Sequence, residues 1–204
     1  FRKQNLPVQI VGSDEATGLS WFARCSEDPS YYDTVDLFAS HRYMQKEDRS
    51  LARLFFGERM DRLRSRTPAK PFITAEFGFQ DARSSHLLNP VMEEYPYAVW
   101  TATFAIEGLN KGVAGFSIWC LHEVYYPGQG FMNYGLWDYN DNDWRVRPVY
   151  HAWAMFTRMT NAGDKVRRVE SSHRRTVQAA CVGNTLFWAN DSDTARAAHV
   201  GYHL

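Results

Sequence analysis

The chain has 204 residues, of which 45% are hydrophobic and 23% charged, which is enough for a globular domain with a sizeable core. Basic and acidic residues number 23 each, so no strong positive field points to nucleic acid or to an anionic membrane surface as a partner. No apolar run approaches the ~18 residues needed to cross a membrane. The three cysteines (Cys25, Cys120 and Cys181) form neither a disulfide framework nor a metal-binding spacing.

In chain order, short β-rich runs alternate with segments of helical periodicity. Strands are predicted at residues 7–12, 35–43, 71–78 and 113–120. Helices are predicted at residues 19–25, 46–65, 89–112 and 147–160. The last three strands are nearly continuous apolar runs, which is typical of a parallel sheet covered by helices. The order therefore predicts an α/β fold, either half of an eight-fold β/α barrel or a small doubly wound sheet.

Residues 89–112 give the clearest helix, because one stripe of apolar side chains recurs at helical spacing and Asn110-Lys111-Gly112 supplies a stop signal. The stripe consists of Tyr95, Ala98, Val99, Ala102, Ile106 and Leu109. Residues 121–146 are predicted to form a long loop. Beyond residue 162, the short runs KVRRVESS, TVQAACVG, TLFWAND and ARAAHVGYHL read as strands. Two domains are thus expected: residues 1–162, and residues 163–204 as part of a β-sandwich.

Polar or aromatic groups stand at the predicted carboxyl end of every strand. They are Ser13-Asp14-Glu15, Ser40-His41-Arg42-Tyr43, Glu76, and Trp119 followed by His122-Glu123 and Tyr125-Tyr126. In a parallel β/α barrel this is the end at which the active site lies. Glycosidic bonds are cleaved by two carboxyl groups, and an indole ring offers a flat face to a sugar. The pattern favours carbohydrate chemistry.

A family resemblance supports this interpretation. The stretch PFITAEFGF, followed by GVAGFSIWCLHEVYYPG, YGLWD and RVRPVYHAWAMFTRMT, resembles the last third of clan A glycoside hydrolases such as families 5, 30 and 39. The resemblance implies a retaining enzyme whose fold is a (β/α)8 barrel. Residues 1–162 would then be the C-terminal half of that barrel, strands five to eight. Residues 163–204 would begin an accessory β-sandwich.

The resemblance also implies roles for particular residues. Glu76 matches the catalytic nucleophile at the end of strand seven, and Trp119 matches the tryptophan that forms the floor of the sugar site. His41 and Tyr43 match groups beside the nucleophile. From the residues alone, Glu123 either binds a sugar hydroxyl or pairs with an arginine across the loop. Three further aromatic side chains are candidates for outer substrate subsites: Tyr125, Tyr126 and Trp137.

One feature of the clan has no match. Its acid/base glutamate follows an asparagine, and no Asn-Glu dipeptide occurs in this sequence. We therefore expect the acid/base residue, and the N-terminal half of the barrel, upstream of Phe1, so that the chain is a fragment. The sequence does not indicate which sugar is recognised, or whether a polysaccharide would be cleaved at its ends or within the chain.

Two alternatives compete with the hydrolase. One is a carbohydrate-binding protein on a degraded barrel that has lost hydrolysis. The other is a flavodoxin-like domain, which is disfavoured because no glycine-rich phosphate loop is present. No cofactor is predicted, and the acidic run at 138–143 lacks the spacing of a calcium loop. A secreted or periplasmic location follows only from the family resemblance.

Overall fold

The computed structural model describes residues 2–4, 6–16, 18, 20–81, 83, 85, 87–139, 143–197 and 201. A four-stranded parallel sheet in the order β1-β2-β3-β4 forms its centre. Its strands are β1 (Val11–Glu15), β2 (Leu37–Gln45), β3 (Phe72–Gln80) and β4 (Gly115–Ile118). The α/β class and the parallel sheet expected from the sequence are confirmed.

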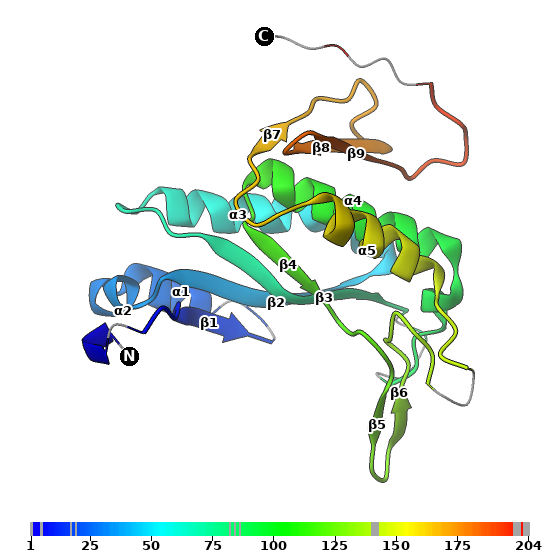
Figure 1. Ribbon diagram of the computed structural model, residues 1–204, viewed down its shortest axis with the longest axis horizontal. Helices are drawn as coiled ribbons and strands as arrows, with labels where there is room; N and C mark the ends of the chain where they lie inside the picture. Colours follow the sequence, from blue (N-terminus) through cyan, green and yellow to red (C-terminus); the bar gives the residue numbers. More distant parts are fainter. Residues whose placement is uncertain are drawn as a thin grey trace.

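Helices cover one face of this sheet. They are α3 (Ala52–Arg64), α4 (Tyr95–Lys111) and α5 (Pro148–Met159), with α1 (Ser20–Glu27) and α2 (Pro29–Thr34) beside β1. Short 3-10 helices η1 (Arg2–Gln4), η2 (Lys46–Leu51) and η3 (Pro90–Glu93) complete the set. Figure 1 shows a third layer beyond the helices, a small antiparallel sheet of β7 (Val166–Arg168), β8 (Val177–Val182) and β9 (Thr185–Asn190).

Several predicted boundaries need correction. The first strand begins at Val11 rather than at residue 7. Helix α2 was not predicted, although Asp28 caps it by accepting hydrogen bonds from the backbone N–H groups of Ser30 and Tyr31. The predicted helices at 46–65 and 89–112 each begin as a 3-10 helix and become α-helical only at Ala52 and Tyr95.

The segment 121–146 is also more ordered than a plain loop. It contains a hairpin of β5 (Val124–Tyr126) and β6 (Gly130–Met132), which projects away from the helical layer (Figure 1). Of the last predicted strand, residues 195–204, the structure describes residues 195–197 and 201, and these form no strand. The other residues of that predicted strand lie outside the described part of the chain. The C-terminal segment therefore forms one three-stranded sheet within the described residues, and the expected sandwich stays a prediction.

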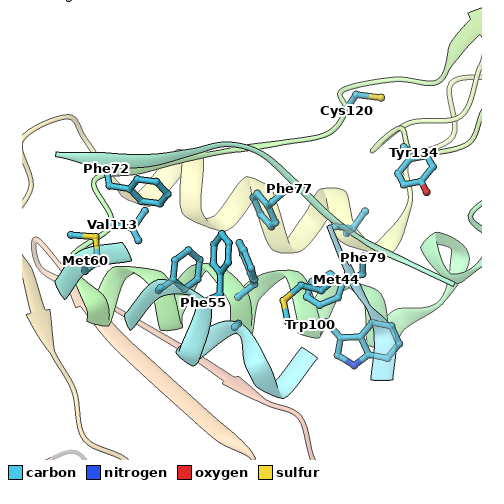
Figure 2. Packing of buried hydrophobic residues seen from close by; sticks show 14 of the residues in the cluster. Met44, Phe55, Met60, Phe72, Phe77, Phe79, Trp100, Val113, Cys120 and Tyr134 are labelled. Carbon is cyan, nitrogen blue, oxygen red and sulfur yellow. The ribbon is translucent and has the colours of Figure 1, made fainter. Parts of the chain in front are cut away.

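Aromatic rings fill the space between the sheet and its helices. Phe77 stacks on Phe104 of α4 with ring centroids 4.7 Å apart, and Phe79 packs edge-on against the same ring. Figure 2 shows Phe72, Phe77 and Phe79 between the strand and the helices, together with Phe55 of α3. Glu76 and Gly78, which alternate with Phe77 and Phe79, therefore face the opposite side of the sheet.

Helix α4 is buried on two sides, so the single apolar stripe predicted from the sequence covers only part of its buried surface. The ring of Phe104 faces the parallel sheet, whereas the side chain of Ile106 faces the small sheet. The stripe members in the apolar cluster that α4 shares with α5, β8 and β9 are Val99, Ala102, Ile106 and Leu109. Tyr95 is 73% exposed, contrary to the prediction. The helix ends as expected, with Gly112 in the left-handed conformation at φ 91°.

Candidate active site on the face opposite the helices

Glu76 lies in the middle of β3, not at its end as predicted, because the strand continues to Gln80. The pairing of β2 with β3 shifts between Ser40 and His41, and the register skips Ala75. Such a bulge changes the direction in which neighbouring side chains point. After it, His41 is paired with Glu76, so both side chains lie on the face opposite Phe77 and the helices.

The carboxylate of Glu76 is held on both oxygens. The Tyr43 hydroxyl donates a hydrogen bond to Oε1 at 2.5 Å, and His41 Nδ1 lies 3.5 Å from Oε2. The other ring nitrogen of His41 lies 3.2 Å from Oδ1 of Asp14. The result is a row Asp14–His41–Glu76–Tyr43 across β1, β2 and β3, in which the Glu76 side chain keeps 21% of its surface exposed.

The hydroxyl of Tyr43 stays a hydrogen-bond donor at any working pH. Burial raises its pKa, and the hydrogen bond to Glu76 and the charge of that carboxylate raise it further. A neutral phenol can donate a hydrogen bond to a carboxylate oxygen and so fix the direction in which the carboxylate points. The arrangement can therefore present an oriented, partly exposed carboxylate to a ligand, which suits a nucleophile or a general base. Within the described residues, no group of three or more His, Cys, Asp or Glu side chains could hold a metal ion.

Trp119 directly follows β4 and is half-buried. Its backbone N–H donates to the carbonyl of Phe77 at 3.1 Å, and its indole N–H points to the sulfur of Met132 at 3.4 Å. The peptide bond between Trp119 and Cys120 is cis. Burial raises the pKa of the Cys120 thiol to about 12, and the charges of Glu76 and Glu123 contribute to this shift. The end of β4 thus lies within electrostatic reach of Glu76.

Glu123 occupies a buried ion-pair network. Its Oε1 accepts hydrogen bonds from Arg147 and, at 2.7 Å, from Asn133. Arg147 also pairs with Asp138 and Glu93. Burial lowers the pKa of Arg147, but its hydrogen bonds to Glu123 and Glu93 outweigh this and raise it. Of the two alternatives for Glu123, the structure shows the pairing with an arginine.

The candidate outer aromatics are spread over the hairpin and the loop after it. Tyr125 is 54% exposed on β5 and Tyr126 ends that strand, whereas Trp137 packs on Tyr150 of α5 at 5.6 Å between ring centroids. Tyr125 also begins a row of neighbouring rings that the sequence did not single out. Neighbouring ring centroids in this row lie 4.7–5.8 Å apart. The further members of the row are Phe131, Tyr139, Trp144 and His122.

The site also includes residues that sequence reasoning missed. The ring of Tyr134 packs edge-on against Tyr43 at 6.0 Å and is buried, and a glycine, Gly78, leaves room for both Tyr43 and Tyr97. A Cβ at Gly78 would lie 3.2 Å from Tyr43 Cε1 and 3.1 Å from the hydroxyl of Tyr97. The only sequence signal was the glycine two residues after Glu76.

Comparison with known proteins gave matches in structure alone. No family model matches the sequence, and no curated protein does. Two solved structures of similar fold are a GH39 β-xylosidase from Caulobacter crescentus (13% identity, TM-score 0.58) and the GH39 enzyme from Xanthomonas axonopodis pv. citri (14%, 0.60). A third is a β-porphyranase of glycoside hydrolase family 86 from Bacteroides plebeius (14%, 0.58).

These alignments cover 88% of the present chain but only 39%, 37% and 35% of the three known chains, in the same order. The chain therefore spans little more than a third of their length. At this level of identity the likeness is one of fold: the described sheet and helices are arranged as in part of a glycoside hydrolase. These matches do not decide which of the glycoside hydrolase families suggested by the sequence the chain resembles most.

Proposed function

We propose that this protein is a retaining glycoside hydrolase that cleaves O-glycosidic bonds of an oligosaccharide or polysaccharide, with Glu76 as the nucleophile. The observation that carries the proposal is the carboxylate of Glu76, which is held by Tyr43 and His41 on the face of the sheet left free by the helices. The fold shared with known glycoside hydrolases supports the same reaction class. In this proposal, residues 1–162 belong to a (β/α)8 barrel.

The reaction would proceed in two displacements. Glu76 attacks the anomeric carbon and forms a covalent glycosyl ester, while a second carboxylic acid protonates the departing glycosidic oxygen. That second group, now a carboxylate, takes a proton from water, and the hydroxide releases the sugar and regenerates Glu76. We place the acid/base group outside these 204 residues, in accordance with the missing Asn-Glu motif.

The neighbouring side chains have distinct proposed roles. Tyr43 and His41 hold the carboxylate in one orientation, which lowers the entropic cost of reaching the transition state. The ring of Trp119 would pack against a sugar, and the ring row that begins at Tyr125 would contact further units of a chain. Glu123 takes no part, because its carboxylate is paired with Arg147.

The test is a Glu76→Gln substitution in the complete protein, assayed with a panel of aryl β-glycosides. We expect kcat to fall by at least about a thousandfold, since the amide cannot form the ester. A 2-fluoro glycoside with a good leaving group should label the peptide that contains Glu76, as measured by mass spectrometry. Glu94→Gln, which changes an exposed carboxylate outside the site, is the matched control.

Two results would count against the proposal. Retained activity in Glu76→Gln would remove the nucleophile assignment. Sugar binding by calorimetry with no turnover of any glycoside by the wild-type protein would instead support the carbohydrate-binding alternative.

A further inference from the structure

The indole ring of Trp119 is held by the hairpin of β5 and β6 that follows it in the chain. Its N–H points to the sulfur of Met132, the last residue of β6, with 3.4 Å between nitrogen and sulfur. Met132 pairs with Val124 of β5, and both side chains pack against the main apolar core, as Trp119 does. The preceding residue, Phe131, points to the other face of the hairpin, where it belongs to the row of rings. Met132 therefore lies on the hairpin face that is turned toward Trp119.

The same short segment also contacts the residue that orients the proposed nucleophile. Tyr134 comes two residues after Met132, and its ring packs edge-on against Tyr43 with the centroids 6.0 Å apart. Tyr43 in turn donates its hydrogen bond to Glu76. The backbone N–H of Tyr134 donates to the carbonyl of Met132 at 3.0 Å, and the carbonyl of Tyr134 accepts from the N–H of Cys120 at 2.9 Å. One segment therefore touches both the indole proposed to bind sugar and the phenol that holds the reacting carboxylate.

A buried ion pair fixes this segment in place. Asn133, the residue after Met132, donates from Nδ2 to Glu123 at 2.7 Å and from its backbone N–H to the carbonyl of Leu87 at 2.8 Å. Glu123 is itself paired with Arg147, which is 3% exposed. A hydrogen-bond acceptor can hold an indole ring in one orientation only if its own backbone is held. The ion pair supplies that support for Met132.

We propose that Met132 is a positioning residue for substrate binding: its sulfur holds the indole of Trp119 in the orientation that presents the ring face to a sugar. This inference rests on the proposed function, because it takes Trp119 as the ring that packs against the substrate. A thioether sulfur is a weak acceptor, so the contact favours one ring orientation modestly. An indole that rotates away loses part of its contact area with the sugar. The loss therefore appears in substrate binding and not in the chemical step.

The first test needs no substrate. The complete protein is labelled with fluorotryptophan, and its fluorine NMR signal from Trp119 is identified by its loss in Trp119→Phe. Met132→Leu keeps the side-chain volume but removes the acceptor, so the Trp119 signal should shift or broaden. Met132→Gln offers an amide oxygen at a similar reach and should restore one sharp signal. Met155→Leu is the matched control, because it makes the same exchange at an exposed position of α5 and should leave the signal unchanged.

The second test measures kinetics with the aryl β-glycoside that the wild-type protein cleaves fastest. Met132→Leu should raise KM by about three- to tenfold, which corresponds to one weak hydrogen bond, and should change kcat by less than about twofold. Met132→Gln should recover most of the lost affinity, and Met155→Leu should behave as the wild type. A role of Met132 in stability alone would lower the melting temperature without this separation of KM from kcat.

A Trp119 signal that stays the same in Met132→Leu would overturn the proposal. So would an unchanged KM, or a fall in kcat as large as the rise in KM. Failure of the proposed function gives a different result: a wild-type protein that cleaves no glycoside, while its Trp119 signal still depends on Met132, would refute the hydrolase and leave the positioning of the indole standing.

Discussion

At the scale of single residues, the candidate site depends on how one carboxylate is surrounded. Glu76 is anchored by a phenol on one oxygen and an imidazole near the other, and the imidazole is itself positioned by Asp14. The contrast with Glu123 is informative, because that carboxylate lies in the same region yet is neutralised by Arg147. Among the described residues, no arginine or lysine pairs with Glu76, whereas an arginine pairs with Glu123.

The role of Tyr43 can be tested by Tyr43→Phe. We expect kcat/KM to fall by about 10- to 100-fold, since a hydrogen bond to a charged group is lost from the nucleophile. The melting temperature should change little, because the ring and its contact with Tyr134 remain. Tyr134→Phe, which removes a hydroxyl that interacts with Gln80 rather than Glu76, should retain most of the activity. Equal losses in both variants would contradict a specific role for Tyr43.

At the scale of elements, a buried charge network fixes the long connection between β4 and α5. Arg147, directly before α5, contacts Glu93 of η3. It also contacts Glu123 and Asp138, which both lie in the connection. It also donates to the carbonyl of Gly135. The network therefore holds the hairpin and its aromatic row in place relative to the sheet, although none of its members touches Glu76.

Arg147→Met should destabilise the protein by about 3–5 kcal/mol, because Glu123 is left as a buried charge without its cationic partner and Asp138 keeps only its contact with Arg145. The free energy of unfolding is measured by urea titration. The matched control is Arg145→Met, since Arg145 contacts Glu93 and Asp138 from an exposed position and should cost less than about 1 kcal/mol. Similar losses in the two variants would mean that burial is not the deciding factor.

At the scale of the whole molecule, the small C-terminal sheet shares a core with the helices of the parallel sheet. Phe187 of β9 stacks on Phe156 of α5 with ring centroids 4.5 Å apart and planes 11° from parallel. Ile106 of α4 is buried in the same cluster. Residues 163–197 therefore pack on the layer formed by residues 1–162, although the sequence suggested two domains.

We expect the two segments to unfold together. Phe187→Ala should lower the free energy of unfolding by about 3–5 kcal/mol while fluorescence and circular dichroism still report one coincident transition. Trp188→Ala, on the exposed face of the same strand, should have little effect. A variant in which the two signals separate would show instead that the C-terminal sheet is an independent unit.

The sequence by itself determined the α/β class and the alternation of four strands with helices along the chain, except for α2. Hydrophobic runs and periodicity are local properties, and they carry this information directly. The resemblance to clan A glycoside hydrolases singled out Glu76 with His41 and Tyr43 beside it, and these residues were also among those expected at the carboxyl ends of the strands.

Only the tertiary structure decided the rest. The bulge at Ala75 turns Glu76 toward His41, and it arises from the pairing of β2 with β3, which no local pattern reports. The pairing of Glu123 with Arg147 joins residues 24 positions apart. The contact between Trp119 and Met132 likewise depends on how the hairpin of β5 and β6 folds back toward the end of β4. Charge and burial at a site are set by neighbours distant in the chain, so they appear only when the chain is folded.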